Sequence, residues 1–243
     1  MLKRLIAATF ALSFILVGGL LAARTYYAGL KLAAAEPQVT ESYTGKPLPA
    51  IDRSTKKLAI LFGDSRISQW SPRPGWPGFA IVNQGVGGDT TAWLLHRFEQ
   101  DVASHRPDLV VIQAGINDMV AAGLNAQAEE RITANAVVNL TTMVQAARAS
   151  GAHVILMTII PPAQPEFWRQ AFWSNRILEL TESVNDKLLP LHAPPHTWVV
   201  DTTAVLKPGG AWLQDMNADT LHLTRLAYVT LNAALEPLLA DKD

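Results

Sequence analysis

Short apolar runs alternate with longer segments of helical periodicity along residues 58–239. The runs are rich in β-branched residues and end in turn-forming residues, which predicts buried strands. Between them, apolar positions recur every three or four residues, which predicts amphipathic helices. We expect strands at 58–62, 79–82, 109–114, 153–159 and 197–200. We expect helices at 91–102, 126–150, 167–191 and 223–239.

Strands that alternate with helices in this way form β-α-β units. The sequence therefore predicts an α/β fold, a three-layer α/β/α sandwich with a mainly parallel five-stranded sheet. Once the N-terminal segment is set aside, about 200 residues are left, enough for one hydrophobic core and not for two. We expect a single domain at 58–243.

The N-terminal segment is strongly apolar. Residues 5–23 carry no charge, with Lys3 and Arg4 before them and Arg24 after them. As a helix this run is roughly 28 Å long, about the thickness of a hydrocarbon core. We therefore expect a membrane anchor within 1–35, followed by a proline-containing linker at 36–57. The alternatives are a cleaved signal peptide, with Ala33–Ala35 as the cleavage site, and a buried helix.

Positive charges before the span favour a cytoplasmic N-terminus, which places the body outside the cytoplasm, in the periplasm. Signal cleavage would instead release a secreted protein. The net formal charge is −1 and the pI is about 6.6, so no basic surface indicates nucleic acid binding. The chain has no cysteine, which excludes disulfides, thiolate catalysis and cysteine-bound zinc. No histidine spacing or glycine motif indicates a metal or nucleotide, so we expect no cofactor.

Small and polar clusters follow three of the predicted strands. They are Gly63-Asp64-Ser65, 85–89 and 115–118, and a fourth cluster at 219–222 lies just before the last predicted helix. In a parallel sheet the carboxyl ends of the strands meet at one edge, where such folds bind substrates. The four clusters are therefore expected to converge.

Together these clusters supply what ester cleavage by a serine needs. Ser65 is the candidate nucleophile, His222 the base, and Asp219 the carboxylate that orients His222. The backbone N–H groups of Ser65 and Gly88 and the side-chain amide of Asn117 are the candidate donors to the oxyanion. Each cluster taken alone could also be a purely structural turn or helix cap. Only the order of the four clusters and their joint position make the prediction specific.

The four clusters resemble the four blocks of the SGNH (GDSL-type) serine hydrolase superfamily of esterases and lipases. The resemblance implies a flavodoxin-like fold and ester hydrolysis without a metal, with Ser65, Gly88, Asn117 and His222 as the family's characteristic residues and Asp219 completing the triad. Residues 83–90 are similar to the platelet-activating-factor acetylhydrolase-like and lysophospholipase-like branches. Arg66 stands where an apolar residue is usual, and we expect it to favour acidic or polar substrates. Ala227 stands where many members have glycine.

The predicted function is a serine esterase that forms an acyl-enzyme on Ser65. The expected substrates are esters of the short-acyl, O-acetyl-glycan or lysophospholipid type. Two alternatives stay open: an acyltransferase that modifies polysaccharides through the same serine, and a non-catalytic carbohydrate-binding scaffold. Six aromatic residues beside the predicted site could line it or simply pack: Trp70, Trp76, Phe167, Trp168, Phe172 and Trp173.

Overall fold

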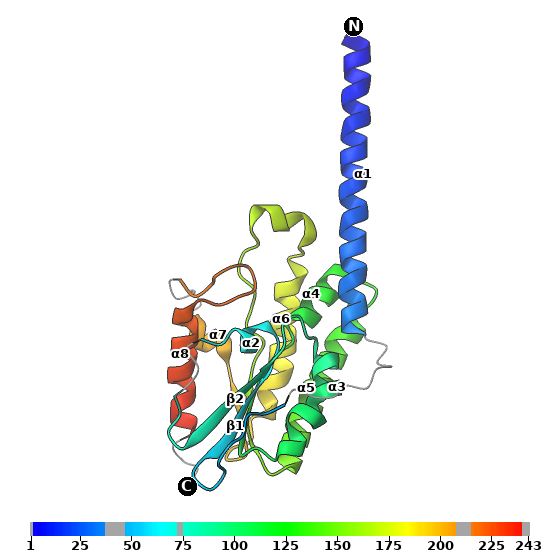
Figure 1. The fold of residues 1–243 in the computed structure, drawn as a ribbon. Coiled ribbons are helices and arrows are strands. Elements are labelled where there is room, and N and C mark those ends of the chain that lie inside the picture. The colour runs from blue at the N-terminus through cyan, green and yellow to red at the C-terminus, as the bar shows by residue number, and fades with distance from the viewer. Residues whose placement is uncertain (1, 37–46, 72–74, 208–214, 240–243) are drawn as a thin grey trace.

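The computed structural model describes residues 2–36, 47–71, 75–207 and 215–239. Their strands form one five-stranded sheet in the order β2-β1-β3-β4-β5, and every neighbouring pair is parallel (Figure 1). The strands are β1 (Lys57–Gly63), β2 (Phe79–Gly85), β3 (Leu109–Gln113), β4 (His153–Met157) and β5 (Thr197–Val200). The predicted parallel α/β sheet is confirmed.

Helices cover both faces of the sheet because alternate strand residues point to opposite sides. Along β1, Ile60 and Phe62 join one buried cluster, and Ala59 and Leu61 join another. The first cluster is covered by α3 (Thr91–Asp101), α4 (Ile116–Leu124), α5 (Glu129–Ala149) and α6 (Arg176–Leu188). The second is covered by α2 (Ser65–Ser68), α7 (Thr202–Leu206) and α8 (Arg225–Leu235). Short 3-10 turns η1 (Ala103–His105), η2 (Phe167–Phe172), η3 (Leu189–Leu191) and η5 (Glu236–Leu239) complete the described chain.

The helix prediction misses α4 and the short α7, and it is wrong about residues 167–191. Helix α4 was not predicted, because its first residues were assigned to the polar cluster at 115–118; its residues from Ile116 to Ala122 are all buried. The predicted helix at 167–191 is divided: η2 comes first, Trp173 is extended, and α6 begins only at Arg176. The first aromatics of this segment point into solvent, so the apolar pattern there does not mark a buried helix face.

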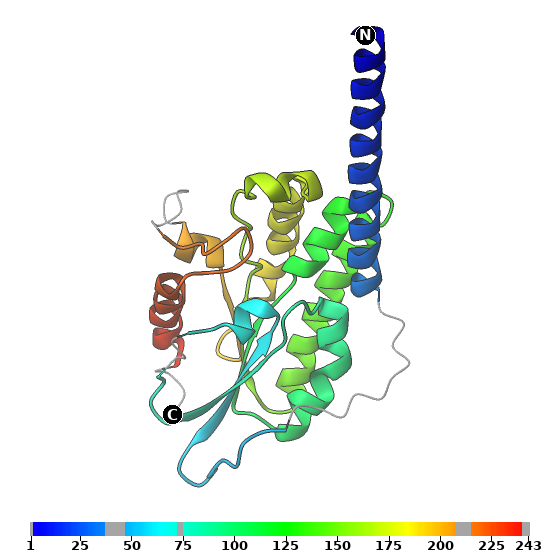
Figure 2. The same cartoon turned by 45° about the horizontal axis from the view of Figure 1, so that its top comes forward.

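A single long helix, α1 (Leu2–Ala35), projects well beyond the rest of the protein in both views (Figures 1 and 2). Residues Leu12–Ala35 are long and apolar enough to cross a membrane, and the apolar window is not buried, unlike a core helix. Only the last turns pack on the domain, mainly against α4. Thr90 Oγ1 donates to Ala34 O at 2.9 Å, and Asn125 Nδ2 donates to Ala28 O at 3.0 Å.

Candidate active site

Ser65 lies where β1 gives way to α2, at the carboxyl edge of the sheet. Asp64 caps the helix: its backbone is extended, and its Oδ1 accepts from Arg66 N at 2.9 Å. Ser65 is half-buried, whereas Asp64 is fully buried. Because the first N–H groups of a helix have no intrahelical acceptor, the Ser65 N–H is free to serve an external oxygen.

The loop after β2 reaches the same point. A Cβ added to Gly87 would lie 3.9 Å from Ser65 Cβ, so this loop passes beside Ser65. Gly88 has a φ of +86°, a left-handed conformation that favours glycine. Gly85 is required for a different reason, since a Cβ there would come within 2.2 Å of Ser68 N. The glycines therefore let this loop turn tightly against α2.

Asn117, in the first turn of α4, is joined to that loop. Its Nδ2 donates to Asp89 O at 2.9 Å, and the amide carries a second N–H that this bond does not use. The sequence interpretation missed Arg97, which links this loop to β1. Its Nε pairs with Asp89 Oδ2 at 2.7 Å, and its Nη2 donates to Gly63 O at 3.2 Å. Arg97 lies on the buried face of α3. A charged residue at an inward-facing position of the predicted helix was the only sign in the sequence that it has a structural role.

Asp219 and His222 share one turn. Asp219 Oδ2 lies 2.7 Å from His222 Nδ1, while Oδ1 accepts from Leu221 N at 2.7 Å and His222 N at 2.9 Å. Partial burial raises the pKa of Asp219, but the hydrogen bonds from His222 and the two backbone N–H groups outweigh it and lower the pKa to about 2. The carboxylate is therefore ionised at neutral pH and can only accept a hydrogen bond from the Nδ1–H group.

Arg66 connects the serine segment to the histidine turn. Its Nε donates to Leu221 O at 2.8 Å and its Nη1 donates to Ile160 O, while Tyr228 Oη donates to Arg66 O at 2.8 Å. Burial raises the pKa of Asp64 to about 6, although the charges of Arg66 and His222 act to lower it. The residues on both sides of Ser65 thus interact with the turn that carries His222.

These contacts correct the expectation that Arg66 selects acidic or polar substrates. Its side chain is buried, and its guanidinium binds two backbone carbonyls of the protein. An arginine therefore stands where an apolar residue was expected after the serine. Its guanidinium binds the loops of the site and is not available to a substrate.

Replacing Arg66 by methionine is therefore expected to lower the free energy of unfolding by about 2–4 kcal/mol, because one buried and one partly buried carbonyl lose their donors. In the folded fraction, kcat for ester hydrolysis should fall about tenfold, since a small displacement of His222 weakens proton transfer. Urea unfolding and steady-state kinetics measure the two effects. Arg148→Met, at an exposed position in the last turn of α5, is the matched control. An unchanged kcat in folded Arg66→Met would show that Arg66 only stabilises the fold.

Other predicted residues take structural positions. Asp118 is buried and accepts from Thr91 N at 2.9 Å and Thr91 Oγ1 at 2.6 Å; its burial raises its pKa to about 7. Trp70 and Trp76 belong to the second core cluster, so packing explains them. Within the described ranges, no group of three or more histidine and acidic side chains is placed to hold a metal ion.

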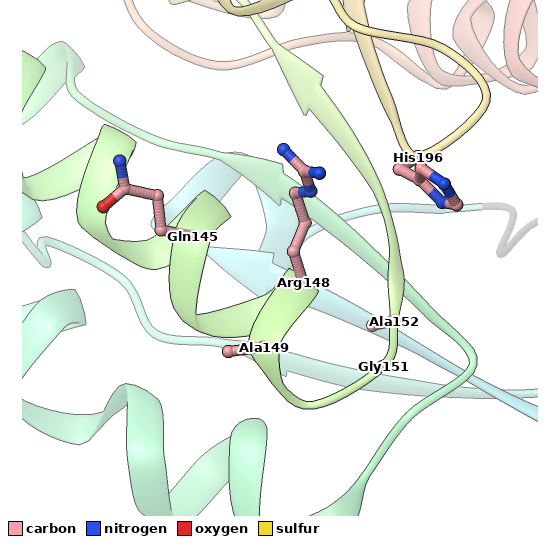
Figure 3. A pocket seen from close by; sticks show the side chains of 6 residues that line it. All are labelled: Gln145, Arg148, Ala149, Gly151, Ala152 and His196. Carbon is pink, nitrogen blue, oxygen red and sulfur yellow. The ribbon is translucent and has the colours of Figure 1, made fainter.

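A surface hollow at the opposite, amino edge of the sheet lies away from these residues (Figure 3). It is formed where α5 turns into β4, and it is open to solvent. Its lining residues are Gln145, Arg148, Ala149, Gly151, Ala152 and His196. Since it holds neither a serine nor a carboxylate, it offers no esterase chemistry.

A parallel α/β/α sandwich with a serine at the tip of its first strand and an Asp-x-x-His turn beside it defines a class, the serine ester hydrolases of flavodoxin-like fold. Within that class, the chain belongs to the GDSL-like lipase/acylhydrolase family, whose model matches residues 61–229. The resemblance seen in the sequence is confirmed, and the chain is a carboxylic ester hydrolase.

Similar proteins agree with this assignment. The chain is 28% identical over 194 residues to an arylesterase of Vibrio mimicus, covering 72% of this chain and 92% of that protein. It is 31% identical over 197 residues to a platelet-activating factor acetylhydrolase IB subunit alpha1 of Bos taurus, covering 77% and 78%. A GDSL-like lipase of Bacteroides thetaiotaomicron has the same fold, with a TM-score of 0.58, 22% identity and coverage of 87% and 97%.

Proposed function

We propose that Ser65 is the nucleophile of this esterase, His222 its general base and Asp219 the residue that orients His222. The observation that carries the proposal is the 2.7 Å contact between Asp219 Oδ2 and His222 Nδ1, in a turn bonded to the side chain that follows Ser65. Because the carboxylate holds the Nδ1 proton, Nε2 is left to accept the proton of a serine hydroxyl.

In the first half of the reaction, Ser65 Oγ bonds to the acyl carbon while its proton passes to His222 Nε2. The carbonyl π electrons move onto oxygen, and the N–H groups of Ser65, Gly88 and Asn117 stabilise that charge. His222 then returns the proton to the departing alcohol, and the ester bond breaks. Water repeats the sequence on the acyl-enzyme and releases the acid and free Ser65.

Short acyl esters are the proposed substrates, acetyl esters first. Support comes from the named relatives, which include an acetylhydrolase and, over 42 residues at 45% identity, an acetylxylan esterase of Geobacillus stearothermophilus. Glycan acetyl esters and acetyl esters of lysophospholipids both belong to this class.

Hydrolysis of p-nitrophenyl acetate, butyrate and octanoate by the full chain in detergent tests this function. The acetate is expected to give the highest kcat/KM, about tenfold or more above that of the octanoate. A pocket that fits a short acyl group can discriminate to this extent against a chain longer by several methylene groups. A fluorophosphonate probe should label Ser65, located by mass spectrometry of the peptides. No turnover of any ester together with an unlabelled Ser65 would refute the proposal.

We also propose that α1 is retained as a membrane anchor, with the catalytic domain on the periplasmic side. The contacts of Ala28 and Ala34 with Asn125 and Thr90 support retention, because cleavage at Ala33–Ala35 would remove packing that the domain uses. Ala35 is itself buried in the first core cluster. Membrane attachment through this helix places the esterase beside lipid.

A further inference from the structure

The segment η2 exposes two large aromatic side chains. Phe167 is 89% exposed and Trp168 66% exposed, and among described residues outside α1 no other large apolar side chain is as exposed as either. Leaving an aromatic side chain of this size in water forfeits about 1.5–3 kcal/mol of burial. Two such residues side by side on one projecting turn need a surface to cover them.

A lipid bilayer crossed by α1 would supply that surface. Tyr27 of α1 packs edge-to-face on Phe172, with ring centroids 5.9 Å apart, so η2 lies against the helix. Tyr27 comes three residues after Arg24, the charge that closes the apolar run, a distance of roughly 4.5 Å along the axis. If α1 spans a membrane with its apolar run, the end of the hydrocarbon core falls next to η2.

The chemistry of this region is typical of a membrane interface. Tyr26 is 70% exposed one residue before Tyr27. Arg169 lies over the Trp168 ring, with Cζ 5.1 Å from its centroid, pairs with Glu166 at 3.3 Å, and acts electrostatically on Lys31. Aromatic side chains prefer the headgroup level, and nearby cations attract anionic headgroups.

The arrangement of the elements points the active site in the same direction. Helix α1 contacts α3, α4 and η2, which all follow the carboxyl ends of strands. In Figures 1 and 2, η2 is the part of the domain that reaches furthest along α1 toward the N-terminus. The edge that carries Ser65 therefore faces the side from which α1 leaves the domain.

The same segment is bonded to the histidine turn. Glu166, immediately before η2, accepts from Thr220 N at 3.1 Å and from Thr220 Oγ1. Ala163 N donates to Thr220 O at 2.8 Å. Thr220 lies between Asp219 and His222, so η2 and the catalytic turn are held together as one unit.

We propose that η2 is a membrane-contacting arm, seated in the interface of the bilayer that α1 spans, and that Ser65 takes esters whose alcohol part is embedded in that bilayer. The proposal rests on the proposed function and anchor, and it narrows the substrate class to membrane-borne short-acyl esters. The acyl chemistry is unchanged, and only the origin of the ester is specified.

The lack of native cysteine makes a direct test possible. The full chain with Phe167→Cys, labelled with bimane and reconstituted in phosphatidylcholine vesicles containing phosphatidylglycerol, is compared with labelled Lys56→Cys, an exposed position before β1. The label at 167 should be quenched by doxyl lipids and protected from iodide, whereas the label at 56 should show the reverse. The proposal is overturned if iodide reaches the label at 167 as readily as the label at 56. It is also overturned if the label at 167 is protected from iodide but not quenched by doxyl lipids, which would mean that protein covers the arm.

Kinetics supply the second measurement. Phe167→Ser/Trp168→Ser should lower hydrolysis of hexadecyl acetate in these vesicles about tenfold relative to hydrolysis of soluble p-nitrophenyl acetate, as expected for losing two interfacial aromatics. Val138→Ser, which removes an exposed apolar side chain from α5, should leave the ratio unchanged. If the double variant keeps the same ratio of hexadecyl acetate to p-nitrophenyl acetate hydrolysis, η2 is not a membrane-contacting arm. Failure of the proposed function looks different, because the unmodified chain would then hydrolyse neither acetate.

Discussion

Replacement of Ser65 by alanine is expected to lower kcat for p-nitrophenyl acetate by about 10⁴-fold or more, the loss typical of removing a serine nucleophile. No other hydroxyl is proposed to bond to the acyl carbon, so the acyl-enzyme cannot form. The backbone of α2 does not depend on the Ser65 side chain, because Asp64 caps the helix and Tyr228 holds its first turn through Arg66 O. The free energy of unfolding should therefore change by less than about 0.5 kcal/mol.

Ser68→Ala is the matched control for this prediction. Ser68 is in the same short helix, is exposed and is not part of the proposed site. Its replacement should leave both kcat and the fluorophosphonate labelling of Ser65 unchanged. If Ser65→Ala kept more than about one hundredth of the activity, the measured turnover would have to come from another nucleophile or from residual oxyanion stabilisation alone.

The sequence predicted the sheet well because its strands carry simple signals. Each is a short apolar run closed by a turn, and the buried pattern of β3, from Leu109 to Gln113, admits few other interpretations. Helix α4 carried no such signal. Its first residues, 116–118, were taken as part of the polar cluster that ends the third predicted strand, and its side chains from Ile116 to Ala122 are all buried between α1, α5 and α6.

The candidate site was predictable as a set of residues, but the supports that hold it were not. A parallel sheet collects its carboxyl ends at one edge, so Gly88 and Asn117 could be placed together with Ser65 before the structure was known. Arg66 and Arg97 were misjudged or missed, because both bind backbone carbonyls that lie far away in the sequence and that only the folded chain brings near. A charged residue in an apolar context indicates burial but does not name its partner.

The exposed aromatics of η2 show the same limit. Their composition fits a helix face, and the sequence interpretation extended a helix through them to residue 191. Whether an aromatic side chain meets a core, a substrate or a membrane depends on where the segment lies relative to α1, which is a tertiary property. The Tyr27–Phe172 contact settles that position.

The second large effect is expected for Asp219→Asn, which should lower kcat by about 10⁴-fold while keeping the fold. An asparagine oxygen can still accept from the backbone N–H groups of Leu221 and His222, the role that Oδ1 has now. The new NH₂ group, however, faces Nδ1 of His222 as a donor. The imidazole then has to carry its proton on Nε2, the nitrogen that must accept the proton of Ser65.

The pKa of Asp219 adds a test in stability. Because its folded pKa of about 2 lies below the ordinary value of 3.8, the ionised carboxylate stabilises the native state above about pH 4, and this contribution is lost as the pH falls toward 2. The difference in free energy of unfolding between the unmodified chain and Asp219→Asn should therefore shrink between about pH 5 and about pH 2. Asp215→Asn, an exposed position in the same region, should show no loss of kcat. Near-normal turnover by Asp219→Asn would mean that His222 finds its tautomer without this carboxylate, and the proposed triad would reduce to a Ser65–His222 pair.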